Sequence, residues 1–444
     1  MFRNSTNTGR FVSNKKRRYL NAIAVIVAAA AALVYFKSPP KPPESSVDRL
    51  QRSWESRALG LERALQNNTP LKDATFFHTH NSYNSSKYTT AFSYLDPNQS
   101  ETIKDQLRLG VRAIELDVHW YFSMEGWPWN WGKRPLLCHG QGNHLGCSSY
   151  DRHLSKGVDE VNSWIRSNRH EVIIVYIEAH LDGRYNEALN VFKSRVGDLV
   201  YTPNTVRPGT TCEDVPMNVT KQQILNSGKN IILWSSGCPG GEWGRWVFRK
   251  NNNVPESNIE RFSNYGACGN FDRNTYNTKM VRYYEDRTNL SNWFGGGSGK
   301  VTPQNMAEMM KCGVNLPGAD KLTATDGRVK AAVWSWHQNE PNDWGGNEDC
   351  AHQWGNGRWN DNNCAVSYRY ACKDASGNWY VTNASGPWQN GYHYCGAETG
   401  GRYSYAVPVN GYENQLLLEA KRARGVNDAW LKYSDRDREG TWSP

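Results

Sequence analysis

The chain has almost no charge imbalance outside its first 37 residues, and those 37 residues contain no acidic side chain. They hold seven lysines or arginines, and the rest of the chain has 45 basic against 43 acidic residues. Proteins that bind nucleic-acid backbones draw their affinity from clustered lysine and arginine. The near-neutral remainder therefore gives no reason to expect a nucleic-acid partner.

Cysteine is missing from the first part of the chain, since all ten cysteines lie between Cys138 and Cys395. An even number of cysteines is typical of an exported protein, and we expect up to five disulfides in an oxidising compartment. With 38% hydrophobic residues, the chain can form one or two packed domains. Glycosylation is expected at candidate Asn-X-Ser/Thr sites, which are Asn67, Asn84, Asn98, Asn218, Asn289 and Asn383.

A long uncharged stretch occurs near the N-terminus, over residues 19–36, and its 18 residues are near the lower limit for a membrane-spanning helix. A basic run precedes it and a Pro-rich segment follows it. This order predicts a cytoplasmic basic tail (1–18), a transmembrane signal anchor (19–36), and a Pro-rich tether and helix (37–66). The protein would then be a single-pass type II membrane protein with its main part extracellular or lumenal. The alternative is a cleaved signal peptide and a secreted protein, because the alanines at 28–32 suit a peptidase.

Short apolar runs alternate with amphipathic stretches in the next part of the chain. Strands are predicted for the runs at 74–80, 111–120, 171–180, 230–236 and 331–336, and helices for 46–66, 102–109 and 158–167. This alternation is typical of an α/β fold with a mostly parallel sheet, and its length fits a TIM-type (β/α) barrel over 67–336. For residues 337–444 we expect a disulfide-stapled, loop-rich β appendage with one helix near 414–424.

Polar side chains mark the ends of three predicted strands. Asn81 follows the first, Glu115 and Asp117 share one face of the second, and Glu178 ends the third. In a barrel such residues would meet at the mouth, where barrel active sites lie. Neighbouring carboxylates repel each other unless a cation or a proton lies between them, and several oxygen ligands suit calcium. These four residues are therefore the predicted calcium ligands.

Two histidines are the candidates for proton transfer. His80 directly precedes Asn81, and His139 follows the short run Pro135 to Cys138. Two imidazoles beside a cation-bound phosphodiester can act as a general acid and a general base. The remaining histidines of these segments are interpreted as structural residues, namely His78, His119, His144 and His180.

The order of these motifs resembles the X-type catalytic core of phosphatidylinositol-specific phospholipase C. The resemblance rests on His80-Asn81-Ser82-Tyr83, on residues 110–117, on Cys138-His139-Gly140 and on Ile177-Glu178. It is nearest to the exported, calcium-dependent phospholipase C-like phosphodiesterases of fungi and bacteria. The resemblance implies that His80 and His139 are the catalytic histidines and that Asn81, Glu115, Asp117 and Glu178 bind calcium. It also implies attack of a headgroup hydroxyl on phosphorus to form a cyclic phosphodiester.

Aromatic residues crowd the segment after the Glu115–Asp117 strand, at Trp120, Tyr121, Phe122, Trp127, Trp129 and Trp131. Amphipathic rings favour the membrane interface, so one interpretation is a rim that seats the barrel on lipid. The other interpretation is that the rings pack beneath the loop, against the Cys138 to Cys147 region.

Residues 337–372 resemble the sugar-binding half of a C-type lectin. The resemblance implies five candidate ligands for calcium and a sugar, which are Glu340, Asn342, Glu348, Asn360 and Asp361, and an inner disulfide between Cys350 and Cys364. A complete lectin module needs another ~60 to 70 residues upstream. The alternative is therefore an extension of the barrel without a sugar site.

Taken together, these patterns predict a calcium-dependent phosphoric diester hydrolase that cleaves a phospholipid headgroup of the phosphatidylinositol kind. The expected partners are a phospholipid or another phosphodiester, a membrane and a carbohydrate. A glycerophosphodiesterase or a sphingomyelinase D-like enzyme is one alternative, because those barrels also place histidines and a Glu/Asp pair at the mouth. A non-catalytic carbohydrate-binding protein of the cell surface is the other.

Overall fold

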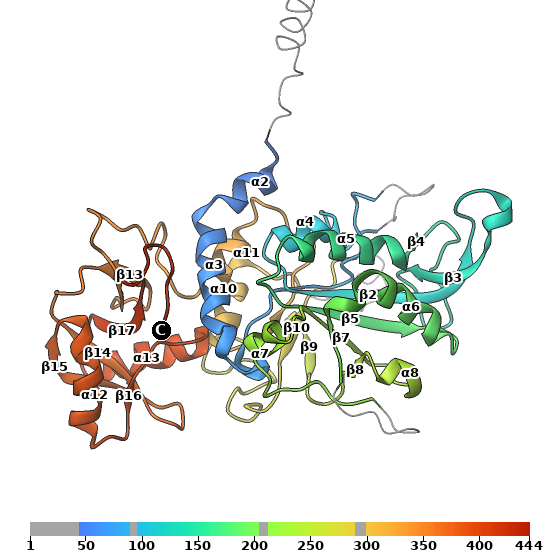
Figure 1. Cartoon of the computed structure of the whole chain (residues 1–444). Helices are drawn as coiled ribbons and strands as arrows, with labels where there is room; N and C mark the ends of the chain where they lie inside the picture. Colours follow the sequence, from blue (N-terminus) through green and yellow to red (C-terminus); the bar gives the residue numbers. More distant parts are fainter. Residues whose placement is uncertain (1–43, 89–95, 204–211, 289–298) are drawn as a thin grey trace, which may run out of the picture. The chain divides into compact units, whose positions relative to one another are not determined.

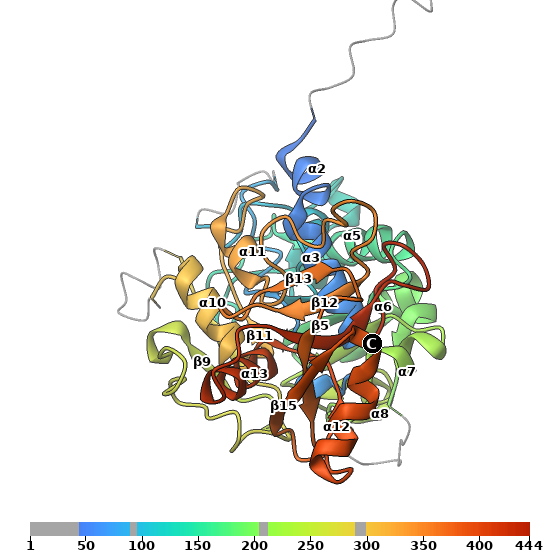
Figure 2. The same cartoon turned by 90° about the vertical axis from the view of Figure 1, so that its left-hand side faces the viewer.

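The structure is a computed structural model that describes residues 44–88, 96–203, 212–288 and 299–444 (Figure 1, Figure 2). Residues 46–444 form one compact unit. The predicted cytoplasmic tail and signal anchor, and most of the Pro-rich tether, lie outside the described residues. Within the described ranges, no helix is long and apolar enough to cross a membrane.

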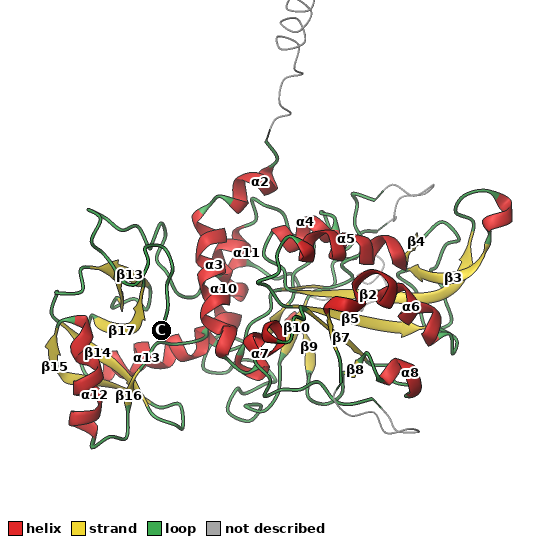
Figure 3. Cartoon of the chain, in the orientation of Figure 1, coloured by secondary structure: helices red, strands yellow, loops and turns green. Residues whose placement is uncertain are grey.

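The largest sheet has eight strands, ordered β4-β3-β2-β5-β7-β6, with β1 paired to β2 and β8 to β7 (Figure 3). The strands are β1 (His78–Thr79), β2 (Ala113–Ser123), β3 (Gly132–Leu137), β4 (Arg152–His153), β5 (Ile173–His180), β6 (Val200–Tyr201), β7 (Ile231–Ser235) and β8 (Phe248–Arg249). Pairing is parallel among β1, β2, β5, β6, β7 and β8, and antiparallel from β2 through β3 to β4. The predicted strands at 111–120, 171–180 and 230–236 are confirmed, and the one at 74–80 is confirmed only for the two residues of β1.

A second, parallel sheet contains β9 (Glu256–Asn258), β10 (Arg282–Tyr284) and β11 (Leu316–Pro317). A parallel bridge from His78 to Gly318 joins this sheet to β1. No pairing joins β8 to β9 in the part of the chain that the structure describes. The α/β architecture is confirmed, but the predicted closed barrel is not.

Helices accompany these sheets at α2 (Ser46–Gln51), α3 (Trp54–Leu65), α4 (Ile103–Arg108), α5 (Leu154–Arg166), α6 (Tyr185–Val196), α7 (Lys221–Asn226), α8 (Gly241–Gly244), α10 (Pro303–Lys311) and α11 (Gly327–Ala332). The predicted helix at 46–66 forms as α2 and α3, because Ser53 caps a new helix start by accepting from Ser56 N. The predicted strand at 331–336 is wrong. The Asp326 carboxylate caps α11 by accepting from Arg328 N at 2.9 Å, so the helix takes the first part of that run.

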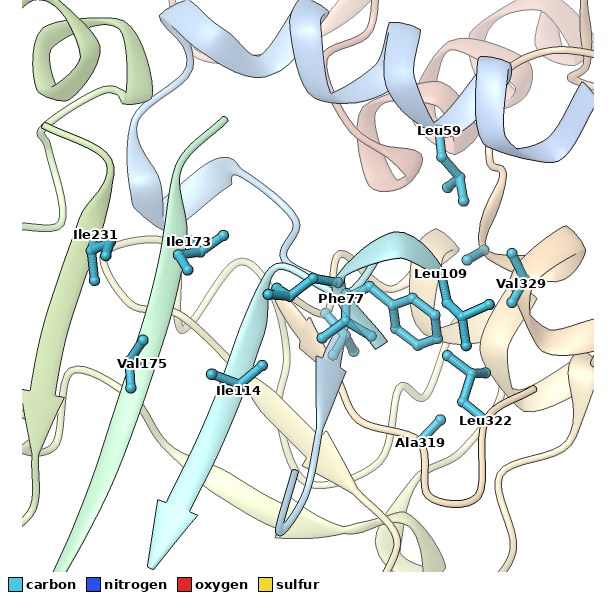
Figure 4. Packing of buried hydrophobic residues seen from close by; sticks show 14 of the residues in the cluster. Leu59, Phe77, Leu109, Ile114, Ile173, Val175, Ile231, Ala319, Leu322 and Val329 are labelled. Atoms are coloured by element: carbon cyan, nitrogen blue, oxygen red, sulfur yellow. The ribbon is translucent and has the colours of Figure 1, made fainter. Parts of the chain in front are cut away.

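One face of β2 faces the hydrophobic core, and the opposite face carries the polar residues. Ile114, Leu116 and Val118 are fully buried in the same cluster as Ile173, Val175 and Ile231 of the neighbouring strands. Figure 4 shows Ile114, Ile173, Val175 and Ile231 of these strands, with Leu59 of α3 and Val329 of α11 around the same core. Because side chains alternate along a strand, this packing fixes Glu115 and Asp117 on the other face.

The C-terminal part contains a six-stranded sheet, ordered β13-β12-β17-β14-β15 with β16 on β14. Its elements are β12 (Cys350–Gln353), β13 (Trp359–Asn362), β14 (Tyr368–Lys373), β15 (Trp379–Gly386), α12 (Gly391–Thr399), β16 (Ser404–Tyr405), α13 (Gly411–Ala423) and β17 (Ala429–Ser434). The predicted helix near 414–424 is confirmed as α13. Glu62 of α3 ties this part to the rest, because its Oε1 accepts from Trp334 N at 2.8 Å and from Ser335 N at 2.9 Å.

All ten cysteines are paired, so the expected five disulfides are present. The pairs are Cys138–Cys147, Cys212–Cys238, Cys268–Cys312, Cys350–Cys364 and Cys372–Cys395. Two of the glycosylation candidates are wrong, since Asn84 and Asn98 are buried hydrogen-bonding side chains. Asn289 lies outside the described residues.

Candidate active site

Three predicted ligands form one carboxylate cluster. Asp117 of β2 and Glu178 of β5 are direct neighbours in the parallel register, and Glu115 lies two residues before Asp117 on the same face. One oxygen of each of these carboxylates lies within 4.8 Å of the others. Burial and the charges of Glu178 and Glu115 raise the pKa of Asp117 well above its ordinary value. Such a cluster needs a bound cation or proton.

Asn81, the fourth predicted ligand, joins this cluster through the orientation of its amide. Its backbone is left-handed (φ 45°), and its Nδ2 donates to Asn98 Oδ1 at 3.2 Å. This orientation turns Asn81 Oδ1 toward the Asp117 carboxylate. In the reverse orientation the amide nitrogen would donate to the Asp117 carboxylate at 2.9 and 3.2 Å. The amide oxygen would then face Asn98 Oδ1, which is also an acceptor.

Asn98 cannot reverse its own amide to accommodate that change. Its Nδ2 donates to Asp286 Oδ1 at 3.1 Å and to Asp320 Oδ2 at 2.9 Å, and these carboxylates accept only. The hydrogen bonds therefore favour an amide oxygen of Asn81 that faces the carboxylate of Asp117. Two facing oxygens fit a hard cation between them, so the residues present fit calcium.

Sequence reasoning missed Arg282, which belongs to the three-residue strand β10. Its Nη2 donates to Glu115 Oε2 at 2.5 Å and its Nη1 to Glu256 Oε2 at 2.6 Å. The guanidinium is buried and lies 4.4 Å from the centroid of the Tyr284 ring. A fixed positive charge therefore lies beside the carboxylate cluster.

His80 lies among carboxylates. Burial alone would lower its pKa, but the charges of Glu115 and Asp320 outweigh burial and raise that pKa to about 10. Its Nδ1 is 3.8 Å from Asp320 Oδ2, an ion-pair distance rather than a hydrogen bond. Asp320 was also missed from the sequence. Its Oδ1 accepts from Gln99 Nε2 at 3.0 Å and its Oδ2 from Arg287 N at 2.9 Å, so the carboxylate is held in place behind His80.

His139 follows β3 and begins the loop closed by the Cys138–Cys147 disulfide. The side chain is exposed, yet desolvation by its neighbours and the charge of His80 lower its pKa. The two predicted catalytic histidines therefore have pKa values shifted in opposite directions. One favours its protonated form and the other its neutral form, which is the pairing that acid–base catalysis requires.

Three further histidines connect the His139 loop to the carboxylate cluster. His144, in the same disulfide loop, has its Nδ1 2.9 Å from Nδ1 of buried His119. The His119 ring packs 4.5 Å from the ring of His180, whose Nε2 lies 2.9 Å from Glu178 Oε1. This cluster docks the loop on β2 and β5.

The C-terminal candidate ligands lie around the start of β12 and β13. Asp361 accepts from Asn342 N at 3.2 Å and from Asp343 N at 2.7 Å. Burial and the neighbouring Asp361 raise the pKa of Glu340 to about 7, and burial and Asp361 also raise that of Glu348. Asn360 is adjacent on β13. Three carboxylates therefore gather here, those of Glu340, Glu348 and Asp361. The predicted Cys350–Cys364 disulfide is confirmed.

The carboxylate cluster thus lies on the parallel strands β2 and β5, with His80 after the parallel strand β1 and His139 after the antiparallel strand β3. The chain belongs to the Rv2075c PI-PLC-like domain family, whose model matches residues 42–326. It is 32% identical to the uncharacterized protein Rv2075c of Mycobacterium tuberculosis over 410 residues, which cover 88% of this chain and 82% of that relative. The protein is accordingly a phospholipase C-like phosphodiesterase.

Two bacterial structures are also similar to the chain. Phosphatidylinositol-specific phospholipase C from Listeria monocytogenes has 12% identity and a TM-score of 0.38, over 62% of this chain and 97% of that chain. A structure of the Staphylococcus aureus phosphatidylinositol-specific phospholipase C has 13% identity and a TM-score of 0.42, over 64% of this chain and 98% of that chain. With such low scores, the family assignment rests on the family model and the mycobacterial relative.

The C-terminal part has short likenesses to C-type lectins. The hepatic lectin of Gallus gallus is 50% identical over 45 residues, which cover 10% of this chain and 22% of that protein. Asialoglycoprotein receptor 1 of Pongo abelii is 46% identical over 44 residues, or 9% of this chain and 15% of that protein. The chain thus spans less than a quarter of either lectin.

Proposed function

We propose that the protein is a calcium-dependent phospholipase C-type enzyme that cleaves the headgroup of a phospholipid, with a phosphatidylinositol-like headgroup as its substrate. The observation that carries the proposal is the Asn81 amide oxygen facing the buried Asp117 carboxylate, next to Glu115 and Glu178. These four residues would hold calcium. When bound, the cation would offset negative charge that develops on the phosphate.

The histidine pair would move the protons. One imidazole takes the proton from a headgroup hydroxyl next to the phosphate, and the other gives a proton to the departing alcohol. The hydroxyl oxygen then bonds to phosphorus as the bond to the diacylglycerol oxygen breaks, leaving a cyclic phosphodiester. Asp320 holds the His80 ring in position, and Arg282 keeps a positive charge beside Glu115.

The cellular setting is part of the same proposal. The uncharged stretch at 19–36 supports a single-pass type II protein whose catalytic unit is extracellular or lumenal, with a secreted form as the alternative. Five disulfides in the compact unit support an oxidising compartment.

A headgroup panel tests the enzymatic proposal. The full-length chain is assayed on phosphatidylinositol, sphingomyelin and glycerophosphocholine, with calcium or with chelator, and Asp117→Asn serves as the cation-site variant. We expect turnover of phosphatidylinositol only when calcium is present. Asp117→Asn should lose both calcium binding and turnover. Release of choline or glycerol would instead favour a sphingomyelinase D-like or glycerophosphodiesterase activity. No turnover by folded protein would favour a non-catalytic carbohydrate-binding protein.

A second candidate function is calcium-dependent sugar binding by the C-terminal part. The gathering of Glu340, Glu348 and Asp361, together with the short lectin likeness, favours it. The full-length chain is passed over immobilised monosaccharides and eluted with chelator. We expect retention that Asp361→Asn abolishes and that Glu419→Gln, an exposed acidic side chain on α13, leaves intact. Retention that resists chelator would contradict the calcium site.

A further inference from the structure

Large exposed hydrophobic side chains are concentrated in one segment of the described chain. Of the eight such side chains, six fall between residues 122 and 150, and these are Phe122, Trp127, Trp129, Trp131, Leu145 and Tyr150. Single exposed apolar residues are ordinary on protein surfaces, but a contiguous group of this size marks an interaction site. We call the four aromatic residues at 122–131 together with Leu145 the hairpin patch.

The tip of the patch presents two tryptophans in a defined arrangement. Trp127 and Trp129 are 67% and 75% exposed, and their rings stack at 5.2 Å with planes 1° apart. A short 3-10 turn over Pro128–Asn130 holds them, with Asn130 N donating to Trp127 O at 2.8 Å. Trp131 Nε1 donates to Gly126 O at 3.3 Å and closes the base of the turn. The two rings therefore do not pack beneath the loop, which was the alternative drawn from the sequence.

The patch is continuous with the candidate active site. β2 carries Glu115 and Asp117 and then runs on into the hairpin, and β3 returns from the tip directly to Cys138 and His139. Figure 1 shows this hairpin extending beyond the sheet at the end where β2 and β5 terminate. Leu145, 66% exposed, lies in the same disulfide loop as His139. The exposed apolar side chains thus lie on the edge that carries the site.

The charges around the tip favour an anionic surface. Glu125, the acidic side chain of the hairpin, forms ion pairs with Lys156 and with His153, the latter at 3.2 Å. The basic side chains of the hairpin are Lys133 and Arg134, and Lys133 is exposed on β3. Lysine and arginine close to an anionic bilayer strengthen the attraction of a protein to that bilayer.

We propose that the hairpin patch inserts into the surface of an anionic phospholipid membrane and holds the active-site mouth against it. The inference rests on the proposed function, since an enzyme whose substrate lies in a bilayer needs its mouth at the interface. Indole rings with an apolar body and an N–H at the edge are suited to the interfacial depth of a membrane.

The test compares vesicle binding by matched tryptophan variants. Residues 46–444, the compact unit with its own core and all five disulfides, are sedimented with phosphatidylcholine vesicles containing phosphatidylglycerol. Chelator is present, so that binding is measured without calcium-dependent turnover. The variants are Trp127→Ser/Trp129→Ser and, as control, Trp344→Ser, which removes an indole that is 80% exposed in the C-terminal part. We expect the double variant to lose about tenfold or more in affinity, and the control to lose nothing.

A conservative variant separates insertion from folding. Trp127→Phe/Trp129→Phe keeps the apolar area and should keep most of the binding, and Lys133→Gln should weaken binding to anionic vesicles more than to neutral ones. Wild-type affinity in the folded serine variant would overturn the proposal. So would self-association that the serine variant abolishes without any change in vesicle binding, because a second copy would then cover the patch. If the protein binds vesicles through the tryptophans but hydrolyses no phosphodiester, the enzymatic proposal is overturned and the proposal of membrane insertion is retained.

Discussion

The Asn98 amide donates a 2.9 Å hydrogen bond to the Asp320 carboxylate, although 222 positions separate the two residues in the chain. The same amide accepts from Asn81 through its Oδ1 at 3.2 Å. One buried side chain therefore orients both a cation ligand and the carboxylate behind His80. The cation site and the proton-transfer site are linked through Asn98.

Replacing Asn98 should impair both sites together. In Asn98→Ala, the Asn81 amide loses the contact that turns its oxygen toward Asp117, and Asp320 loses one of its donors. We expect calcium affinity and turnover each to fall about 10- to 100-fold, as for other residues that orient metal ligands. Calorimetry and initial rates measure the two effects. Asn84→Ala, which removes a 2.8 Å donor to Asn98 Oδ1 and a 3.3 Å donor to Asp96 O, should have a smaller effect. Near-normal calcium binding in Asn98→Ala would contradict the link.

The Asp320 carboxylate should control the titration of His80. It is one of the charges that raise the pKa of His80 to about 10, so Asp320→Asn must lower that pKa. The limb of the pH–rate profile that reports His80 should therefore move to lower pH. Nuclear magnetic resonance of the imidazole across the pH range measures this pKa directly. An unchanged His80 pKa in a folded Asp320→Asn variant would show that the 3.8 Å contact has no electrostatic effect.

The His144 ring should hold the His139 loop in place. His144 has a left-handed backbone (φ 65°), a conformation that asparagine tolerates, so His144→Asn removes the ring with little backbone cost. We expect turnover to fall about tenfold because His139 is less well positioned, with faster amide exchange across residues 139–146. Gln141→Ala, at an exposed position of the same loop, is the control. Unchanged exchange in the loop would remove the basis for this role.

The contribution of Glu62 to the stability of the compact unit should fall as pH rises above the range in which unfolded glutamates titrate. Burial raises the pKa of Glu62 from 4.5 to about 7, although its hydrogen bonds to Ser335 and Trp334 oppose the shift. Between these pH values the unfolded chain loses this proton before the folded chain does. The part of the free energy of unfolding that depends on Glu62 should therefore decrease by up to roughly 3 kcal/mol from pH 4.5 to 7.

Denaturant unfolding at several pH values measures this dependence. Glu62→Gln cannot ionise and should make the dependence shallower, leaving the part due to other buried carboxyls such as Glu285, whose pKa burial also raises to about 7. Glu187→Gln, exposed on α6, should keep the wild-type profile. An equal pH slope in Glu62→Gln would place the effect elsewhere.

The sequence predicts most reliably the elements that are long enough to show a pattern. The eight residues of β5 and the eleven of β2 carry apolar runs that end in polar side chains, and their predicted ligands Glu115, Asp117 and Glu178 do gather in space. Arg282 and Asp320 were missed because β10 has three residues and β11 has two, too few for any periodicity. Asn98 was predicted only as a glycosylation site, because its role depends on contacts with residues about 190 and 220 positions away.

The most direct test of the central claim is the product formed from phosphatidylinositol, followed by phosphorus nuclear magnetic resonance. The full-length chain is compared with His80→Ala and His139→Ala, and with His393→Ala as an exposed control in the C-terminal part, each with calcium and with chelator. We predict a cyclic inositol phosphodiester signal from the wild type and the control in calcium only, and none from the other two variants. A signal that survives chelator or either substitution, or a product that is never cyclic, would contradict calcium-dependent catalysis by the His80 and His139 pair.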